Sequence, residues 1–218
     1  MSGIAGLPEH QYHLARPDAP LPAQTGMQWI WAGNGVFKRG ATAVLEIMLL
    51  VAPTPPTPGL AHLVAGVRWM HWAGRIPGMV LSPLLADAQR AADTSGAIAR
   101  PIEKQYFIHQ QAGRLSLRPA RAQQATGHRV CYAMPTGTDV LMDIHSHHGM
   151  AAFFSSTDDA DDTGLGVSVV IGRIFDAPEI ICRLNVYGQH QRVPALTLFD
   201  GLGPFRDCYG GADADLDA

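Results

Sequence analysis

Cysteine, long apolar runs and blocks of like charge are all scarce in this chain. Its 218 residues include three cysteines, an odd number without CxxC spacing, which excludes a disulfide framework and argues against a cysteine-type zinc knuckle. No apolar stretch reaches the length that a membrane-spanning helix needs, and no apolar signal core stands near the N-terminus. We therefore expect a cytoplasmic location and no membrane partner.

The charge balance also disfavours nucleic acid as a direct partner. The chain has 16 Lys and Arg against 19 Asp and Glu, a formal net charge of −3, and no basic block. Apolar residues make up 47% of the chain, which is enough to build a packed core without disulfide bonds. A globular protein is expected.

Turn and breaker residues divide the chain into four parts. Residues 1–25 are rich in proline and predict an extended arm, residues 26–96 a β-rich segment that ends in a helix, residues 97–200 the main domain, and residues 201–218 a tail. In the second part, QWIWAGNGVF predicts two strands around a Gly-Asn-Gly turn, and VLEIMLLV predicts a third strand.

The helix and the main domain follow from capping residues and strand-like runs. Ser82 as N-cap and Pro83 at the first helical position predict the helix. Six runs predict strands in the main domain: residues 103–109, 114–118, 129–133, 140–147, 166–174 and 180–187. Together these patterns predict an α/β or α+β domain with a mixed sheet, preceded by a smaller β-rich segment.

The stretch DIHSHHGMAAFFSSTDDADD, residues 143–162, carries the chemistry. His145 and His147 are two apart on a predicted strand, so their imidazoles point to the same face within reach of one metal ion. Ser155 can cap a helix that begins there and that returns Asp158 toward the histidines. Two histidines and one carboxylate leave a fourth position open, which is typical of a catalytic Zn²⁺ site.

These residues resemble the motif of JAB/JAMM (MPN-type) metalloproteases, which consists of an upstream Glu, H-S/T-H-P and then S-x-x-D. His145 and His147 with the serine between them, Ser155 and Asp158 match the motif, and His148 stands where the family has Pro. The resemblance implies a JAB/MPN-like mixed sheet flanked by helices, with Zn²⁺ held by His145, His147 and Asp158. It also implies that Ser155 stabilises an oxyanion and that an upstream Glu is the general base.

Two glutamates compete for the role of the general base. Glu103 lies at the start of a predicted apolar strand, after a helix and a loop, and the family has its catalytic Glu at such a point. Glu46 is the alternative because a carboxylate inside VLEIMLLV is unusual, although an edge strand with Glu46 facing water would also explain it. His148 is a further nitrogen near the metal, and a loop histidine is the simpler interpretation.

Within the family, several short sequence segments of the main domain resemble those of JAB-domain proteins of the plasmid-associated PRTRC system of bacteria. The segments are PIE at 101–103, DIHSHH at 143–148, AFFSSTDDAD at 152–161 and VIGR at 170–173. The resemblance implies a ubiquitin-like protein or its conjugate as substrate, and other components of the same gene cluster as partners. The alternatives are a non-catalytic JAB-fold scaffold, and an iron oxygenase with two histidines and one carboxylate, whose second histidine usually lies far along the chain.

Overall fold

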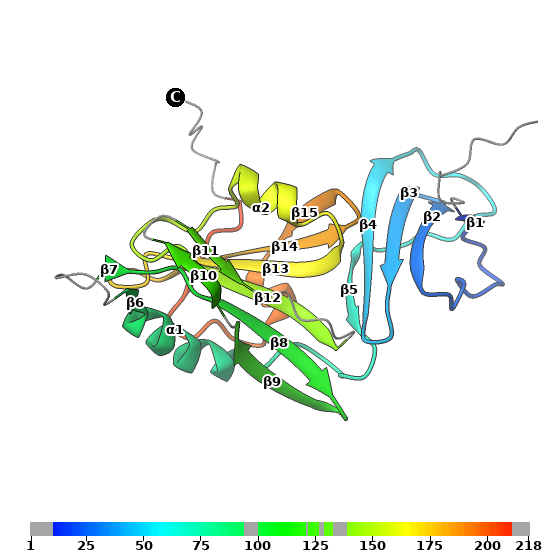
Figure 1. The fold of residues 1–218 in the computed structure, drawn as a ribbon. Helices are drawn as coiled ribbons and strands as arrows, with labels where there is room; N and C mark the ends of the chain where they lie inside the picture. The colour runs from blue at the N-terminus through cyan, green and yellow to red at the C-terminus, as the bar shows by residue number, and fades with distance from the viewer. Residues whose placement is uncertain (1–10, 94–99, 121, 127–128, 133–138, 211–218) are drawn as a thin grey trace, which may run out of the picture.

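The computed structural model describes residues 11–93, 100–120, 122–126, 129–132 and 139–210 of the chain. These residues form mostly strands and a few short helices, and two sheets lie side by side in the molecule (Figure 1). The predicted α+β class, with a β-rich N-terminal part and a mixed sheet after it, is therefore confirmed.

The N-terminal sheet has five strands in sequence order. They are β1 (Gln11–Leu14), β2 (Gly26–Ala32), β3 (Gly35–Ala41), β4 (Leu45–Pro53) and β5 (Gly66–Trp69). Strands β2 to β5 pair antiparallel, whereas β1 pairs parallel with β2. Part of the expected extended arm is therefore a strand, because its backbone groups find partners along the open edge of β2.

The turn between β2 and β3 is tied to the loop that follows β4. The Asn34 side chain donates a hydrogen bond to the Leu63 carbonyl (2.8 Å) and accepts one from the Leu63 N–H (2.9 Å). Gly33 leaves no room for a Cβ, which would lie 2.6 Å from the Leu60 carbonyl oxygen. The predicted hairpin thus forms where the small turn residues allow two backbone segments to approach closely.

The larger sheet has seven strands, on the path β15-β14-β13-β12-β8-β9 with β16 beside β14. They are β8 (Gln105–Gln111), β9 (Arg114–Pro119), β12 (Val140–Ser146), β13 (Leu165–Gly172), β14 (Glu179–Val186), β15 (Gln189–Val193) and β16 (Arg206–Asp207). Strands β12 and β13 pair parallel, and their connection contains α2 (Ser156–Asp161). Since parallel neighbours need a crossover, α2 lies over one face of this sheet.

Short elements complete the described structure. They are β6 (Ala92–Asp93) paired with β7 (Arg100–Pro101), β10 (Ala122–Thr126) paired with β11 (Arg129–Tyr132), the 3₁₀ helix η1 (Gly78–Val80), α1 (Leu81–Arg90) and α3 (Ala195–Leu198). Figure 1 shows α1 and α2 on opposite sides of the larger sheet. In the described ranges, no helix combines the length and the apolar content that crossing a bilayer requires.

One apolar core joins both sheets and α1. It includes Ile47 of β4, Leu84 of α1 and Ile144 of β12, all three fully buried. Because side chains alternate along a strand, His145 points to the opposite face from Ile144, toward α2. The core therefore fixes which face of β12 carries the histidines.

Helix α1 begins earlier than predicted. The predicted N-cap, Ser82, lies inside the helix, which starts at Leu81 directly after η1, and the N-cap residue is Val80 without a side-chain cap. Leu81 is fully buried, so its packing replaces a serine cap worth about 1 kcal/mol. Pro83 is tolerated because first-turn amides have no partner within the helix.

Parts of the described region after β15, residues 194–210, pack against the larger sheet. Phe205 is buried in the main core, and β16 pairs with the first residues of β14. Cys182 of β14 is buried. Residues 1–10 of the expected arm and 211–218 of the expected tail lie outside the described residues. The division into four parts stays a prediction.

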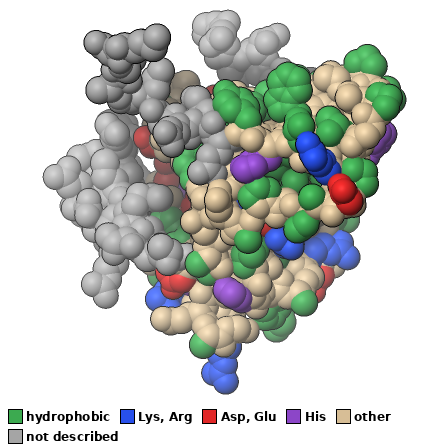
Figure 2. Space-filling model, turned by 90° about the vertical axis from the view of Figure 1, so that its right-hand side faces the viewer, with side chains coloured by type: hydrophobic (Ala, Val, Ile, Leu, Met, Phe, Trp, Pro, Cys, Tyr) green, Lys and Arg blue, Asp and Glu red, His purple; other side chains and the backbone are tan. Residues whose placement is uncertain are grey.

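The end of the molecule formed by the N-terminal sheet exposes hydrophobic side chains. Figure 2 shows several groups of them on this end, with basic, acidic and histidine side chains between the groups. Exposed large side chains here include Tyr12, Leu14 and Trp31, and the register places Leu14 opposite Trp31. The surface of helix α2 is polar by comparison with this end of the molecule. Its six residues include three aspartates and no large apolar side chain.

Candidate metal centre

The end of β12 brings His145 and His147 together. His147 follows the last residue of the strand and donates its N–H to the Ile171 carbonyl of β13 (2.8 Å). This bond continues the alternation of the strand, and the two Nε2 atoms lie 3.2 Å apart. His147 is buried, and the Phe153 ring packs edge-on against it with centroids 4.6 Å apart.

Helix α2 supplies the carboxylate through a capping box. Ser155, the N-cap, accepts a hydrogen bond at Oγ from the Asp158 N–H (3.3 Å), and Asp158 Oδ2 accepts one from the Ser155 N–H (2.6 Å). Oδ2 also accepts the Ser155 hydroxyl proton (2.7 Å). The other oxygen, Oδ1, lies 3.3 Å from His145 Nε2. One oxygen of Asp158 thus fixes the helix start while the other faces the histidines.

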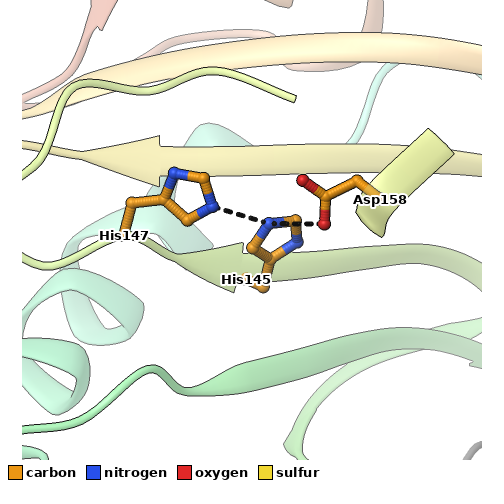
Figure 3. A group of neighbouring side chains, drawn as sticks. All are labelled: His145, His147 and Asp158. Atoms are coloured by element: carbon orange, nitrogen blue, oxygen red, sulfur yellow. Dashed lines mark hydrogen bonds and ion pairs between the residues drawn. The ribbon is translucent and has the colours of Figure 1, made fainter. Parts of the chain in front are cut away.

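The spacing of these three side chains fits a metal ion (Figure 3). Their ligand atoms all lie within 4.8 Å of one another. Metal–ligand bonds of about 2.0–2.1 Å in a tetrahedron separate neighbouring ligand atoms by about 3.3–3.4 Å. The observed separations of 3.2 Å between the imidazoles and 3.3 Å from His145 to Asp158 agree with this value. The structure therefore brings together all three predicted ligands. Three ligands fill three positions of a tetrahedral site, so a fourth would be free for another ligand.

The surroundings favour neutral imidazoles. Burial lowers the pKa of His145, and it outweighs the opposing charges of Asp158 and Asp162. Burial also lowers the pKa of His147, and a charge on His145 lowers it further. A neutral imidazole keeps the lone pair with which a histidine binds a metal ion.

Glu103 lies beside the histidines, in the segment that leads into β8. The next residue, Lys104, donates its N–H to Ser146 Oγ and accepts the Ser146 N–H, each at 3.0 Å. The charge of Glu103 acts on His147, whose pKa it raises against the larger effect of burial. The structure thus puts Glu103 near the cluster, although outside the group of three ligands. Its role as general base stays a prediction.

Glu46, the alternative base, belongs to the N-terminal sheet. The idea of an edge strand is wrong, because β4 lies between β3 and β5. Glu46 accepts a hydrogen bond from Arg39 Nε (3.1 Å) at one oxygen and from Arg68 at the other. Burial raises the pKa of the Glu46 carboxyl, but the bonds from the two arginines outweigh it and hold the pKa below its ordinary value. A carboxylate paired in this way is a weak proton acceptor.

The departure from the family motif at His148 coincides with a special backbone conformation. His148 has a φ of 45°, in the left-handed region, whereas a proline ring fixes φ near about −65°. In this turn the His148 carbonyl accepts the Ile174 N–H (2.8 Å). Pro therefore cannot replace His148 on this backbone. The grouped ligand atoms come from His145, His147 and Asp158, without His148.

Sequence reasoning missed a polar network beneath α2. Arg183 and Asn185 of β14 donate hydrogen bonds to Asp162, and Asn185 also donates to Ser168, whose hydroxyl donates to Asp143. Burial, followed by the charge of Asp162, raises the pKa of Asp143 to about 7. The signal was present in IICRLNV, because Arg and Asn two residues apart put polar groups on one face of an apolar strand.

A second carboxylate that was missed supports the loop between β12 and α2. Glu179 is only 3% exposed and accepts the Ala152 N–H at 3.1 Å. Arg173 and Arg206 neutralise its charge from the outside. The loop that leads to the capping box is therefore attached to β14 as well as to β12.

The comparisons with known proteins agree with this geometry. Residues 82–185 match the family model described as prokaryotic homologs of the JAB domain. This range begins in α1, ends in β14 and contains Glu103 and the three grouped residues. No curated protein matches the chain. Residues 82–185, a little under half of the chain, are therefore similar to JAB domains of the prokaryotic type.

Proposed function

We propose that this JAB-like domain is a zinc-dependent metallopeptidase or isopeptidase that cleaves a peptide or isopeptide bond of a ubiquitin-like protein. The observation that carries the proposal is the convergence of His145, His147 and Asp158, whose ligand atoms lie within 4.8 Å of one another in a region similar to JAB domains. Two nitrogens and one carboxylate oxygen form a donor set that suits Zn²⁺ and leaves a position for water or substrate.

The proposed chemistry is hydrolysis of an amide. When bound, Zn²⁺ supplies Lewis-acid polarisation of the scissile carbonyl and lowers the pKa of a water molecule. Glu103 accepts the proton of the attacking water and passes it to the leaving amine, a role that fits its place beside His147. Burial around the histidines keeps bulk water from competing for their nitrogens.

Ser155 has the role of a donor to the oxyanion in this proposal. Its hydroxyl has one proton, and in the structure it gives that proton to Asp158 Oδ2. Stabilising an oxyanion therefore requires an exchange of this bond when substrate enters. The capping bond from the Asp158 N–H to Ser155 Oγ is compatible with the exchange, because the oxygen acts there as the acceptor.

The substrate class rests on the resemblance to PRTRC system protein A. A bacterial gene cluster of this kind implies ubiquitin-like and activating-enzyme-like components, and we propose these as substrate and partners. A non-catalytic scaffold would have no need of a converged ligand set, which favours the enzyme over the scaffold.

The test compares metal content and cleavage of a ubiquitin-like fusion protein for wild type and three variants. We expect His147→Ala to lose both zinc and cleavage, and Glu103→Gln to keep zinc while kcat falls about 10²- to 10⁴-fold. Glu46→Gln is the matched control and should keep both. Cleavage by Glu103→Gln at the wild-type rate would disprove the base assignment. Zinc binding without cleavage of any such fusion would favour the scaffold, and an iron content with oxygen-dependent activity would favour the oxygenase.

A further inference from the structure

Helix α2 lacks the apolar side chains that normally hold a helix on a sheet. It has six residues, and none of them is buried. A helix of this length is unstable by itself, so contacts with the rest of the fold must hold it in place. The capping box orders its first turn but attaches it only to its own chain neighbour. Asp158 therefore depends on another anchor for its position over β12.

Arg183 of β14 supplies such an anchor from below. Its side chain is 4% exposed and lies under α2. One terminal nitrogen bonds Asp159, and the other terminal nitrogen and Nε bond Asp162 Oδ2 at 2.7 and 3.2 Å. The guanidinium thus binds Asp159 and Asp162, which lie about one helical turn apart at the start and the end of α2.

Phe154 and Asn185 make further contacts around the Arg183 guanidinium and its aspartate partners. Phe154 precedes the N-cap residue, and the Arg183 Cζ lies over its ring, 4.0 Å from the ring centroid. Asn185 donates a hydrogen bond to Asp162 at 3.0 Å and fixes the same carboxylate. Arg183 therefore contacts the chain on both sides of Ser155 and Asp158, whereas Asp158 itself turns to Ser155 and His145.

We propose that Arg183 is a positioning residue of the metal centre, which clamps α2 to β14 so that Asp158 reaches the histidines. The proposal rests on the proposed function in that it takes Asp158 as a metal ligand. It goes beyond that function, because Arg183 belongs to neither the ligand set nor the catalytic pair.

A positioning role and a purely electrostatic role of Arg183 predict opposite changes in zinc affinity when the residue is replaced. Deleting a cation near a divalent ion strengthens the binding of that ion if charge alone matters. Releasing α2 weakens the binding, because Asp158 loses its fixed place. Arg183→Lys keeps the charge but loses the planar fork that holds two carboxylates. The sign of the change in zinc affinity therefore separates the two explanations.

The experiment measures zinc affinity by competition with a chelator for Arg183→Met, Arg183→Lys and the control Arg68→Met. Arg68 also pairs with a carboxylate, but in the N-terminal sheet. We expect Arg183→Met to bind zinc about 10- to 100-fold more weakly, Arg183→Lys to lie between it and wild type, and Arg68→Met to bind as wild type does. Affinity in Arg183→Met that equals or exceeds that of wild type would overturn the proposal.

Hydrogen exchange in the metal-free protein gives a readout that is independent of zinc. In Arg183→Met, the amides of residues 156–161 should exchange faster while those of β12 and β13 keep their protection. Uniform loss of protection, or no change in α2, contradicts a clamp. If wild type itself binds no zinc, the proposed function fails, and the exchange of α2 still decides whether Arg183 anchors the helix.

Discussion

Each of the two sheets carries a cluster of arginine and carboxylate side chains, and the proportions are opposite. In the N-terminal sheet one carboxylate, Glu46, lies between two arginines. In the larger sheet one arginine, Arg183, lies between two aspartates. In the first cluster both oxygens of the carboxylate accept from an arginine, while in the second cluster one arginine donates to two carboxylates.

This difference separates a structural ion pair from a site. A carboxylate whose two oxygens both accept from arginine has a lowered pKa and little capacity for another ligand. Around α2 the arginine binds Asp159 and Asp162, which both follow Asp158, and Asp158 keeps Oδ1 for His145. Spare bonding capacity, and not the presence of buried charge, distinguishes the metal centre.

The largest effect is expected from Asp158→Asn, which removes the charge of the grouped carboxylate at nearly constant size. Zinc affinity should fall by more than about 100-fold, beyond the 10- to 100-fold loss typical of outer residues of a metal site. Asp161→Asn is the matched control, because Asp161 is exposed on the same helix. Chelator competition checks both. Equal losses in the two variants would mean that only the total charge of α2 matters.

The next effect concerns the loop that carries the capping box. A Cβ on Gly172 would lie 2.3 Å from the Ala152 nitrogen, so Gly172→Ala must push the loop away from β13. We expect a loss of stability of about 1–3 kcal/mol from overpacking, together with weaker zinc binding. Gly166→Ala, in the same strand, has open space and should change neither. Thermal unfolding and zinc titration test the pair, and normal zinc binding in Gly172→Ala would show that the loop position is not needed.

A smaller effect is expected in the N-terminal cluster. Glu46→Gln leaves two arginines without their carboxylate and should lower the free energy of unfolding by about 1–2 kcal/mol. Zinc affinity should not change, because the group of three ligands lies in the other sheet. Urea unfolding and zinc titration of the same sample measure both quantities. A loss of zinc binding would show that the two clusters are coupled.

The smallest effect is the pH dependence of the same cluster. The folded pKa of Glu46 is lowered, so its contribution to stability is present above the unfolded value of about 4.3 and is lost as the pH falls through the folded value. The stability difference between wild type and Glu46→Gln should therefore be constant near neutral pH and shrink below about pH 4. Urea midpoints on both sides of that pH measure it. A difference that grows on acidification would contradict the paired carboxylate.

Local patterns were sufficient for much of the fold and for the ligand group. The Gly-Asn turn, the apolar runs and the spacing of His145 and His147 all act within a few residues, so the sequence predicts the hairpin, the strands and the shared face. The S-x-x-D pattern predicts the capping box of Ser155 and Asp158 for the same reason. Helix α1 and strand β1 are exceptions, because burial of Leu81 decided where the helix starts and pairing with β2 made a strand of part of the arm.

The sequence by itself determined which residues can bind a metal ion, because their spacing along one strand and one helix start is a local property. Only the tertiary structure decided how the remaining charges are used. Glu46 is paired with arginines because β3 and β5 lie beside β4, and Arg183 reaches α2 because β14 lies beside β13. Such partners are far apart along the chain, so their pairing depends on strand order and register, which no short motif contains.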